Sequence, residues 1–569
     1  MEINYAQEKV GKITFQGNET FGGRTLKKLI ATKVRQPFDE ELLEQDLELI
    51  SKFYQGEGFL SVTIEKSIES NPQGQIVNIL INEGSRVKIS AISLTGFAAF
   101  SEIKIMNLLG IKIGDYLLIR KLEAANKRVI DFYKNSGYPY IILDLDTVVK
   151  DNRADIYFSI QEGPLSYIKE IKVRGNFSVK TWTIIRASEI KRGEKFSQER
   201  LYQAQRRLYA TRLFSRVSFY VLGIEERKDS LTVRFDVSEL PARSFIFGLG
   251  YQLPPSRFLF ALGWEHLNIL NRGQNVSFAS EFTPNFRGDY ELNLEVVYKV
   301  PYLIKIPINF STKPFLNLVR QQENYSTEFG LETGISRYFG ANWEFNLSNR
   351  YRKRLFNYSD SLITDTVTRR GITNSLIFNF SYDSRNSFFN PSQGLYLSPI
   401  IEYAGGILGG DNDFYRASIE FRLFQNLTKI LIFGFRGLAG ISYPHSRSTM
   451  IPYYEKFYIG GRNTLRGYDD KSVGPLIVSD EHYGDFIINT NFELRTTFYK
   501  NFGLVLFFDG GDVMDEIGDF KLSNYQYSIG LGIRFNTPVG PIRLDYGKRL
   551  KNPEPNDKGK LYLGLLHAF

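Results

Sequence analysis

Residue combinations that could support catalysis are few in this sequence. The four histidines do not share the spacing of metal ligands, and no His-Glu-x-x-His or Gly-x-Ser-x-Gly motif is present. The Gly-Leu-Gly at 530–532 lacks the third glycine of a dinucleotide motif. An acidic run without the spacing of a calcium loop reads as a solvated turn at Asp509, Asp512, Asp515 and Glu516. We therefore expect no enzyme, no catalytic residue, no metal site and no cofactor.

Some charged residues fit an ionic contact between side chains better than they fit catalysis. Arg466 is followed by Gly467 and Tyr468, and the carboxylates of Glu493 and Asp509 come further along the chain. A guanidinium pairs with carboxylates in bidentate geometry, glycine allows a tight backbone, and tyrosine can pack against a wall. An isolated Arg-Gly-Tyr is more often a plain solvated turn. The site therefore depends on whether the fold brings this segment to the two carboxylates.

From about residue 244 onward, large apolar residues alternate with polar or small ones. In the first such stretch the alternating residues are Phe245, Ile246, Phe247, Gly248, Leu249, Gly250 and Tyr251. Alternation is typical of strands with a lipid-facing side, although a soluble β-sandwich also alternates, with its apolar side inward. Length separates the two, since residues 241–569 provide about 16 strands at roughly 20 residues per strand and turn. We expect an all-β transmembrane barrel of about 16 antiparallel strands over residues 241–569.

The last nine residues read as one more amphipathic strand. One face carries Leu561, Leu563, Leu565 and Phe569, and the other carries Tyr562, Gly564, Leu566 and Ala568. Such a strand is typical of the end of an outer-membrane barrel, and it must pair because lipid does not tolerate open sheet edges. We expect a seam with the first strand, formed by Phe245, Phe247, Gly248, Gly250, Leu563, Gly564 and Phe569. Gly248 and Gly250 should weaken this seam, because glycine loses more entropy and packs little.

The first 240 residues contain a repeat of 79 positions. Gly17, Gly96 and Gly175 each follow a short alternating stretch, and the Glu-Gly pairs at 83–84 and 162–163 have the same spacing. Each unit reads as strand, helix, helix, strand, strand, which makes a small α+β module with both helices on one face of its sheet. We expect three modules, at residues 8–84, 85–163 and 164–240.

Together these features resemble a known family. The modules resemble POTRA (polypeptide-transport-associated) domains in order and size, and the barrel segments resemble those of the BamA/TamA family of outer-membrane insertases. The segments concerned are YDSRNSFFNPSQGLYLSP at 382–399, GGRNTLRGY at 460–468, NFELR at 491–495, FFDGGDV at 507–513 and GLGIRFNTPVGPIRLDYG at 530–547. The resemblance implies that the 460–468 loop lies inside the barrel, where Arg466 would face Glu493 and Asp509. Its role would be to fix the loop and brace the barrel near its seam.

The same resemblance implies an assembly factor for outer-membrane proteins, in a BamA-like or TamA-like role. It would receive unfolded β-barrel clients through periplasmic POTRA modules and insert them into the bacterial outer membrane at a lateral barrel seam. The expected partners are unfolded outer-membrane protein clients, outer-membrane lipid and periplasmic or lipoprotein accessory subunits. Nucleic acid is not expected as a partner, because the net charge of +9 comes without a block of Lys and Arg.

Two other functions stay open at this point. A two-partner-secretion porin would pass one cognate protein through its lumen; such porins share the loop motif but generally carry two POTRA modules and an N-terminal plug helix. A structural or passive pore protein would use its modules to bind envelope components. The first residues, MEINYAQEKV, show no apolar segment and no small-residue cleavage site. We expect no secretory signal peptide here, and a mature chain behind a start methionine.

Overall fold

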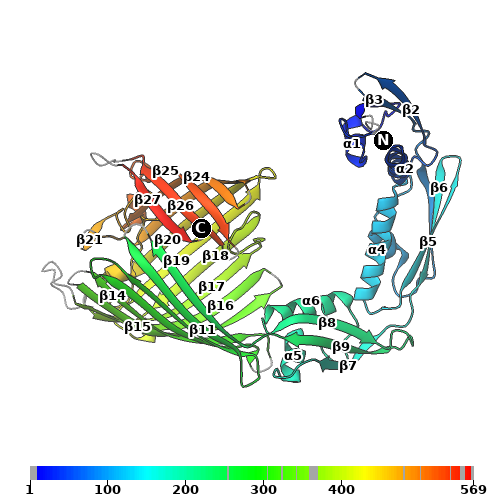
Figure 1. Cartoon of the computed structure of the whole chain (residues 1–569). Coiled ribbons are helices and arrows are strands. Elements are labelled where there is room, and N and C mark those ends of the chain that lie inside the picture. The colour runs from blue at the N-terminus through cyan, green and yellow to red at the C-terminus, as the bar shows by residue number, and fades with distance from the viewer. Residues whose placement is uncertain are drawn as a thin grey trace, which may run out of the picture. The chain divides into compact units, whose positions relative to one another are not determined.

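The computed structural model divides the chain into two compact units (Figure 1). The first comprises Met1–Gly175, Ala187–Ala210 and Arg216–Ser238, and the second comprises Asn176–Arg186, Thr211–Ser215 and Glu239–Phe569. The structure describes residues 9–72, 74–252, 256–303, 306–321, 324–340, 342–357, 370–478, 481–499, 501–537, 540–551, 558–565 and 569.

Three modules of one design make up the first 240 residues. The first contains β1 (Val10–Gln16), α1 (Gly23–Leu29), α2 (Glu40–Gly56), β2 (Thr63–Asn71) and β3 (Gly74–Asn82). The second contains β4 (Lys88–Thr95), α3 (Glu102–Leu109), α4 (Ile119–Asn135), β5 (Ile142–Lys150) and β6 (Arg153–Gln161). The third contains β7 (Tyr167–Arg174), α5 (Thr181–Ser188), α6 (Gln198–Ala210), β8 (Phe214–Leu222) and β9 (Ser230–Glu239). In each sheet the last strand lies in the centre and pairs in parallel with the first, which leaves the second strand at an edge.

Each module buries the apolar stripe of its longer helix against its own sheet. In the first module, Leu43 and Ile50 of α2 share a core with Val77 and Ile79 of β3. Leu43 and Ile50 lie two helical turns apart and so on one helix face, while Val77 and Ile79 alternate onto one sheet face. The helical spacing of the α2 residues and the alternation of the β3 residues therefore place apolar side chains in the same core.

The glycine that recurs every 79 positions has a steric cause. Gly17, Gly96 and Gly175 have φ angles of +74°, +77° and +82°. A Cβ atom at any of them would lie 2.1 Å from a main-chain oxygen of the last strand of the same module. Only glycine fits this left-handed turn, because any other residue would add both a clash and backbone strain.

The second half is a barrel of antiparallel strands. Among the described residues, sixteen strands form one sheet whose neighbours follow chain order from β10 to β27 (Figure 1). They are β10 (Arg243–Gln252), β11 (Arg257–Ile269), β12 (Gln274–Pro284), β13 (Tyr290–Val300), β14 (Asn309–Gln321), β15 (Asn324–Phe339), β16 (Trp343–Asn357), β17 (Arg370–Asp383), β18 (Gly394–Ala404), β19 (Phe414–Asn426), β20 (Leu431–Pro444), β23 (Phe486–Tyr499), β24 (Phe502–Met514), β25 (Gln526–Thr537), β26 (Gly540–Arg549) and β27 (Lys560–Leu565). The predicted fold class, three α+β modules followed by a barrel of about 16 strands, is confirmed.

Successive residues of the barrel strands face opposite sides of the sheet. On β17, Leu376 and Phe378 are exposed on the outer face, while Thr373, Ser375 and Ile377 are buried on the lumen side. An apolar outer face and a polar interior are what a lipid-facing barrel requires. Among the described residues, no helix is both long enough and apolar enough to cross a membrane.

Candidate functional site

The segment 445–485 joins β20 to β23 and is called the inner loop below. Its middle part, residues 459–473, is packed against the barrel wall. The inner loop contains the short strands β21 (Leu476–Val478) and β22 (Glu481–His482), which pair with each other. The loop residues Ile459, Leu465 and Tyr468 form a buried apolar cluster with Ile487 of β23 and Val513 of β24. This cluster fixes the middle of the loop against the barrel wall.

Gly467, at the tip of the inner loop, allows the closest approach to the wall. Its φ is +102°, and a Cβ atom there would lie 3.1 Å from the main-chain carbonyl carbon of Lys548 on β26. A larger residue would be strained and would push the loop away from β26. This position of the loop brings the neighbouring side chain, Arg466, next to carboxylates on the lumen side of the wall.

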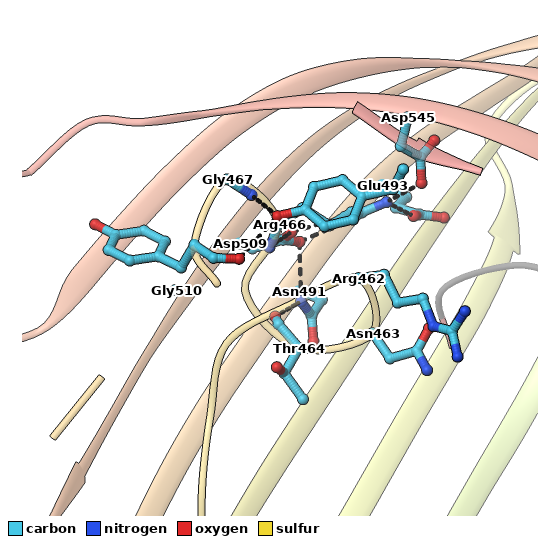
Figure 2. A network of polar contacts seen from close by, with 12 residues as sticks. Arg462, Asn463, Thr464, Arg466, Gly467, Asn491, Glu493, Asp509, Gly510 and Asp545 are labelled. Atoms are coloured by element: carbon cyan, nitrogen blue, oxygen red, sulfur yellow. Dashed lines mark hydrogen bonds and ion pairs between the residues drawn. The ribbon is translucent and has the colours of Figure 1, made fainter. Parts of the chain in front are cut away.

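Arg466 lies between three buried carboxylates, as Figure 2 shows. Its Nε and Nη2 donate to the two carboxylate oxygens of Asp509 at 2.7 and 2.8 Å, which is a bidentate pair. Its Nη1 donates to Glu493 Oε1 at 2.7 Å and to Asp545 Oδ2 at 3.2 Å. The guanidinium carbon also lies 3.5 Å from the centroid of the Phe507 ring. With an exposure of 1%, Arg466 is among the largest fully buried side chains of the protein.

These contacts make Arg466 the centre of a buried ionic network. Desolvation of the four charged groups is costly, and good geometry with several hydrogen bonds is needed to offset it. Removing one partner of such a buried pair typically costs about 3–5 kcal/mol, because the other charges stay buried. The arrangement can hold a loop in place.

Further polar residues surround this centre, and sequence reasoning did not single them out. Asn491 donates to Asp509 at 2.9 Å and to the main-chain oxygen of Thr464 at 2.6 Å, as seen in Figure 2. Arg495 donates to Glu493 at 2.7 Å, and Arg534 donates to Asp545. The signal that could have found these residues was the strand alternation, which puts each of them on a lumen face.

The last hairpin of the barrel also holds the loop tip. Arg549 of β26 donates to the main-chain oxygen of Gly467 at 3.0 Å. Tyr562 of β27 accepts a hydrogen bond from the Gly467 N–H at 2.9 Å. Lys560, also on β27, pairs with Asp469 at 2.6 Å. The inner loop is thus bonded to the strand at one end of the sixteen-stranded sheet.

The two ends of the sheet, β10 and β27, lie next to each other. No hydrogen-bonded ladder joins them among their described residues. The outward side chains of β10 are unusually bare: Phe245, Phe247 and Leu249 are 69%, 76% and 82% exposed, whereas Phe260 on the next strand is 44% exposed. Partly covered outward side chains are normal for a strand with two neighbours, so β10 behaves as a sheet edge.

The glycines expected at the seam lie on lumen faces. A Cβ at Gly248 would lie 3.1 Å from Ala261 Cβ, and one at Gly250 would lie 3.2 Å from the side chain of Leu259, so both face β11 closely. Gly564 faces Arg543 of β26, at 3.1 Å from its Nε by the same measure. Leu563, opposite Leu544 of β26, is half-buried.

Phe569 does not continue the outward row of Leu561 and Leu563, contrary to the expectation from alternation. Its ring is buried against Phe424 of β19, at 6.1 Å between centroids, and the guanidinium of Arg495 lies 5.2 Å from it. The burial explains the difference, since Phe424 and Arg495 lie on the lumen side and offer an aromatic and a cationic partner. Leu566 and Ala568, expected on the opposite face, lie outside the described residues.

The acidic residues Asp509, Asp512, Asp515 and Glu516, interpreted from the sequence as a solvated turn, are only partly one. Asp509 and Asp512 belong to β24 and are buried, so that interpretation is wrong for these two. Asp515 and Glu516 follow the strand and are exposed. In the described ranges, no group of three or more His, Asp or Glu side chains is arranged to hold a metal ion.

Comparison with known proteins adds to this geometry. Residues 268–569 match the Omp85 superfamily domain, and residues 8–84, 87–163 and 166–240 each match the POTRA repeat, described as a surface antigen variable number repeat. The chain is 24% identical to the outer membrane protein assembly factor BamA of Nitratidesulfovibrio vulgaris, over 95% of this chain and 70% of that protein. It is 21% identical to the factor of the same name in Neisseria meningitidis serogroup B, over 98% of this chain and 78% of that protein.

Solved structures show the same fold. A crystal structure of BamA from Haemophilus ducreyi lacking POTRA domains 1–3 has a TM-score of 0.64 at 17% identity, over 84% of this chain and 99% of that one. The structure of CdiB from Acinetobacter baumannii has a TM-score of 0.52 at 14% identity, over 92% of this chain and 97% of that one. The chain belongs to the Omp85 superfamily, with its barrel in the bacterial outer membrane and its POTRA modules in the periplasm.

Proposed function

We propose that this protein is an assembly factor that inserts other β-barrel proteins into the outer membrane. The observation that carries the proposal is the pair of sheet ends, β10 and β27, which lie side by side without a ladder between their described residues. An open strand edge in lipid leaves main-chain groups unsatisfied, at several kcal/mol each as an order of magnitude. A client strand that pairs with β10 or β27 satisfies those groups, so the seam can template new strands.

The POTRA modules would supply clients to this seam. Among the described residues, the edge strands β2, β5 and β8 each have one neighbouring strand in their own sheet. An extended client can add to such an edge by β-augmentation, in which main-chain hydrogen bonds give affinity with little dependence on sequence. Client folding and burial of apolar surface in the bilayer would drive the reaction, since no nucleotide motif occurs in the sequence.

The partners of this function are unfolded outer-membrane proteins, outer-membrane lipid and periplasmic or lipoprotein accessory subunits. The names of the two BamA relatives support the first of these. The choice between a BamA-like and a TamA-like role belongs to the proposal as well; three modules resemble the TamA arrangement.

Reconstitution of the full chain in liposomes tests the proposal. Insertion of an unrelated unfolded barrel protein, scored by protease protection, should be faster with the protein than in empty liposomes. The chain has no cysteine, so cysteine pairs with one residue on β10 and one on β27 can be scanned for a pair that oxidises. Closing the seam with such a disulfide should abolish insertion, and a reducing agent should restore it.

A disulfide elsewhere in the barrel provides the control. Thr312 and Thr333 face each other in the β14–β15 ladder, with hydroxyls 3.1 Å apart. The pair Thr312→Cys and Thr333→Cys should form a disulfide and leave insertion unchanged. Full insertion with a covalently closed β10–β27 seam would contradict the proposal.

The alternative is a two-partner-secretion porin, which passes one soluble protein through its lumen. The fold similarity to CdiB leaves this function for the same experiment to decide. The number of modules argues against it, because such porins generally carry two POTRA modules, whereas three repeats match here. Transit of one soluble client into the liposomes, without insertion of unrelated barrels, would favour the porin.

A further inference from the structure

A second charged residue of the inner loop, Glu455, is buried against the barrel wall, where it contacts other strands than Arg466 does. Glu455 ends a short 3-10 helix, Tyr453–Glu455, in the first part of the loop. Its Oε2 lies 2.9 Å from Nη2 of Arg352 on β16, and its Oε1 accepts a hydrogen bond from the Thr373 hydroxyl on β17 at 3.0 Å. Arg416 on β19 donates to its main-chain oxygen. With 4% exposure, Glu455 is nearly as buried as the carboxylates around Arg466.

Glu455 completes a set of four alternating charges. Glu402 on β18 lies 3.2 Å from Arg352 and 2.9 Å from Arg416, so each arginine is flanked by both glutamates. Three members of this set belong to the wall, and only Glu455 comes from the loop. Without its carboxylate, two arginines with side chains only 12% and 18% exposed would share a single glutamate. Such a loss is unfavourable, because a buried charge keeps its desolvation penalty when its partner is removed.

The residue before Glu455 adds neutral contacts with the same part of the wall. The Tyr454 main-chain oxygen accepts from Arg354 Nη1 at 3.1 Å, and its ring lies 5.0 Å from the Arg354 guanidinium. Its hydroxyl accepts from Asn412 at 3.2 Å. Gly371 provides the space for this ring, since a Cβ there would lie 2.4 Å from the Tyr454 hydroxyl. The wall is therefore shaped to receive this part of the loop.

The contacts of Arg466 and Glu455, two buried charged residues of the loop, have opposite signs and involve different wall strands. At Arg466 the loop supplies the cation, and β23, β24 and β26 supply the carboxylates. At Glu455 the loop supplies the carboxylate, and β16 and β19 supply the cations. We propose that Glu455 is a second anchor of the inner loop beside Arg466, and that the two anchors together hold the loop across the lumen. Releasing either anchor loosens the loop, and releasing both loosens it further.

Ion conductance measures directly whether the loop is held across the lumen. It does not depend on client insertion, so its outcome is separate from that of the proposed function. A loop held across the lumen limits current through the purified full-length protein in planar bilayers. We expect Glu455→Gln to increase the time spent at high conductance at least twofold. Glu455→Asp, which keeps the charge, should stay near wild type. The double variant Glu455→Gln, Arg466→Gln should exceed the sum of the two single effects.

Glu332→Gln is the matched control. Glu332 is also a lumen carboxylate with two cationic partners, but both partners, Lys313 and Arg350, belong to the wall. It should leave conductance unchanged, and a rise equal to that of Glu455→Gln would overturn the proposal. So would wild-type conductance of a Glu455→Gln protein that still migrates as a folded barrel in unheated SDS gels.

If Glu455→Gln does not fold, a milder variant still tests the second anchor. Thr373→Val removes the hydroxyl that donates to Glu455 and keeps the size of the side chain and every charge. It should raise the time at high conductance in the same direction, by a smaller factor than twofold. Unchanged conductance of folded Thr373→Val would then overturn the second anchor.

Discussion

The hydroxyl of Tyr562 donates a hydrogen bond to the main-chain oxygen of Tyr468 at 2.8 Å, which links the last strand of the barrel to the tip of the inner loop. The same hydroxyl accepts the N–H of Gly467. Tyr562 therefore satisfies two main-chain groups of the loop that are buried and away from water. Of the two strands at the seam, β27 is bonded to the loop in this way, while β10 is paired with β11. The loop thus ties one side of the seam to the rest of the barrel.

Tyr562→Phe should therefore destabilise the barrel. The variant removes the acceptor of the Gly467 N–H and leaves the Tyr468 carbonyl with the Gly461 N–H at 3.2 Å as its donor. An unsatisfied buried polar group costs about 1–3 kcal/mol. The midpoint of urea unfolding in phospholipid vesicles, followed by tryptophan fluorescence from Trp264 and Trp343 on barrel strands, should fall accordingly.

Tyr546→Phe is the control for the loss of a hydroxyl near the seam. Tyr546 lies on β26 and donates to the Lys558 main-chain oxygen at 2.6 Å, but its side chain is exposed. That bond involves no residue of the inner loop, so its loss should lower the unfolding midpoint by less than the loss of the Tyr562 hydroxyl, which bonds two groups of the loop. Equal shifts for the two variants would contradict the coupling of Tyr562 to the loop.

Replacing Arg466 by lysine should separate charge from geometry. Lysine keeps the positive charge, but its ammonium cannot make the bidentate pair with Asp509 and contact Glu493 at the same time. Losing charge-assisted hydrogen bonds in a buried site costs about 1.5–3 kcal/mol each. Arg466→Lys should lower the unfolding free energy of the barrel by at least that amount in the same urea experiment.

A bidentate pair with an exposed arginine serves as the reference for Arg466. Arg212 holds both carboxylate oxygens of Glu265, at 3.2 and 2.8 Å, but its side chain is 66% exposed. Exposed ion pairs contribute about 0–1 kcal/mol, because water solvates the separated charges. Arg212→Lys should therefore be nearly neutral, and a cost as large as that of Arg466→Lys would argue against the buried network.

Periodicity in the sequence predicted the fold because it reflects local geometry. The 79-residue repeat predicted three equal modules, and the two-residue alternation predicted lipid-facing strands, since both patterns follow from which side chains must be buried. The resemblance to the BamA/TamA family implied that Arg466 faces Glu493 and Asp509, and the structure places both carboxylates against it.

The rest of the site depends on contacts that a single strand pattern does not contain. Alternation gives the face of a residue but not which loop meets it, so Asp545, Tyr562 and Glu455 were not singled out. The contacts of Glu455 join the loop to strands more than thirty positions away along the chain, as with Arg416 and Thr373. Phe569 departs from the alternation because its ring finds Phe424 and Arg495 in the lumen.

Gly96→Ala should destabilise the second module. Its φ of +77° already disfavours alanine, and the added Cβ would lie 2.1 Å from the main-chain oxygen of Ile160. Gly114, in the same module, has a φ of +92° but open space around it, so Gly114→Ala measures the backbone strain alone. We expect Gly96→Ala to cost about 1–3 kcal/mol more than Gly114→Ala, as overpacking does. Hydrogen exchange of the amides of β4 and β6 in the whole protein should report this, and equal protection in the two variants would contradict it.

Glu239 should make the third module sensitive to acid. Its burial opposes the charged form, but hydrogen bonds from the Ser178 hydroxyl and from the main-chain N–H groups of Val179, Ser178 and Phe177 prevail and lower the pKa of Glu239 below its ordinary value of 4.5. A carboxyl group whose pKa is lower in the folded protein stabilises the fold above its unfolded pKa, and this contribution is lost as the pH falls through the folded pKa.

The stability difference between the wild type and Glu239→Gln should therefore be present at pH 7 and shrink as the pH falls below about 4.5, the ordinary carboxyl pKa. Protonated Glu239 resembles glutamine, which is why the two proteins converge in acid. Hydrogen exchange of β7 and β9 at a series of pH values, compared between the two proteins at each pH, measures this difference. Glu225→Gln, at an exposed position of the same module, is the control and should track the wild type throughout. A difference for Glu239→Gln that stays constant from pH 7 to pH 3 would show that the carboxylate charge does not hold the turn after β7.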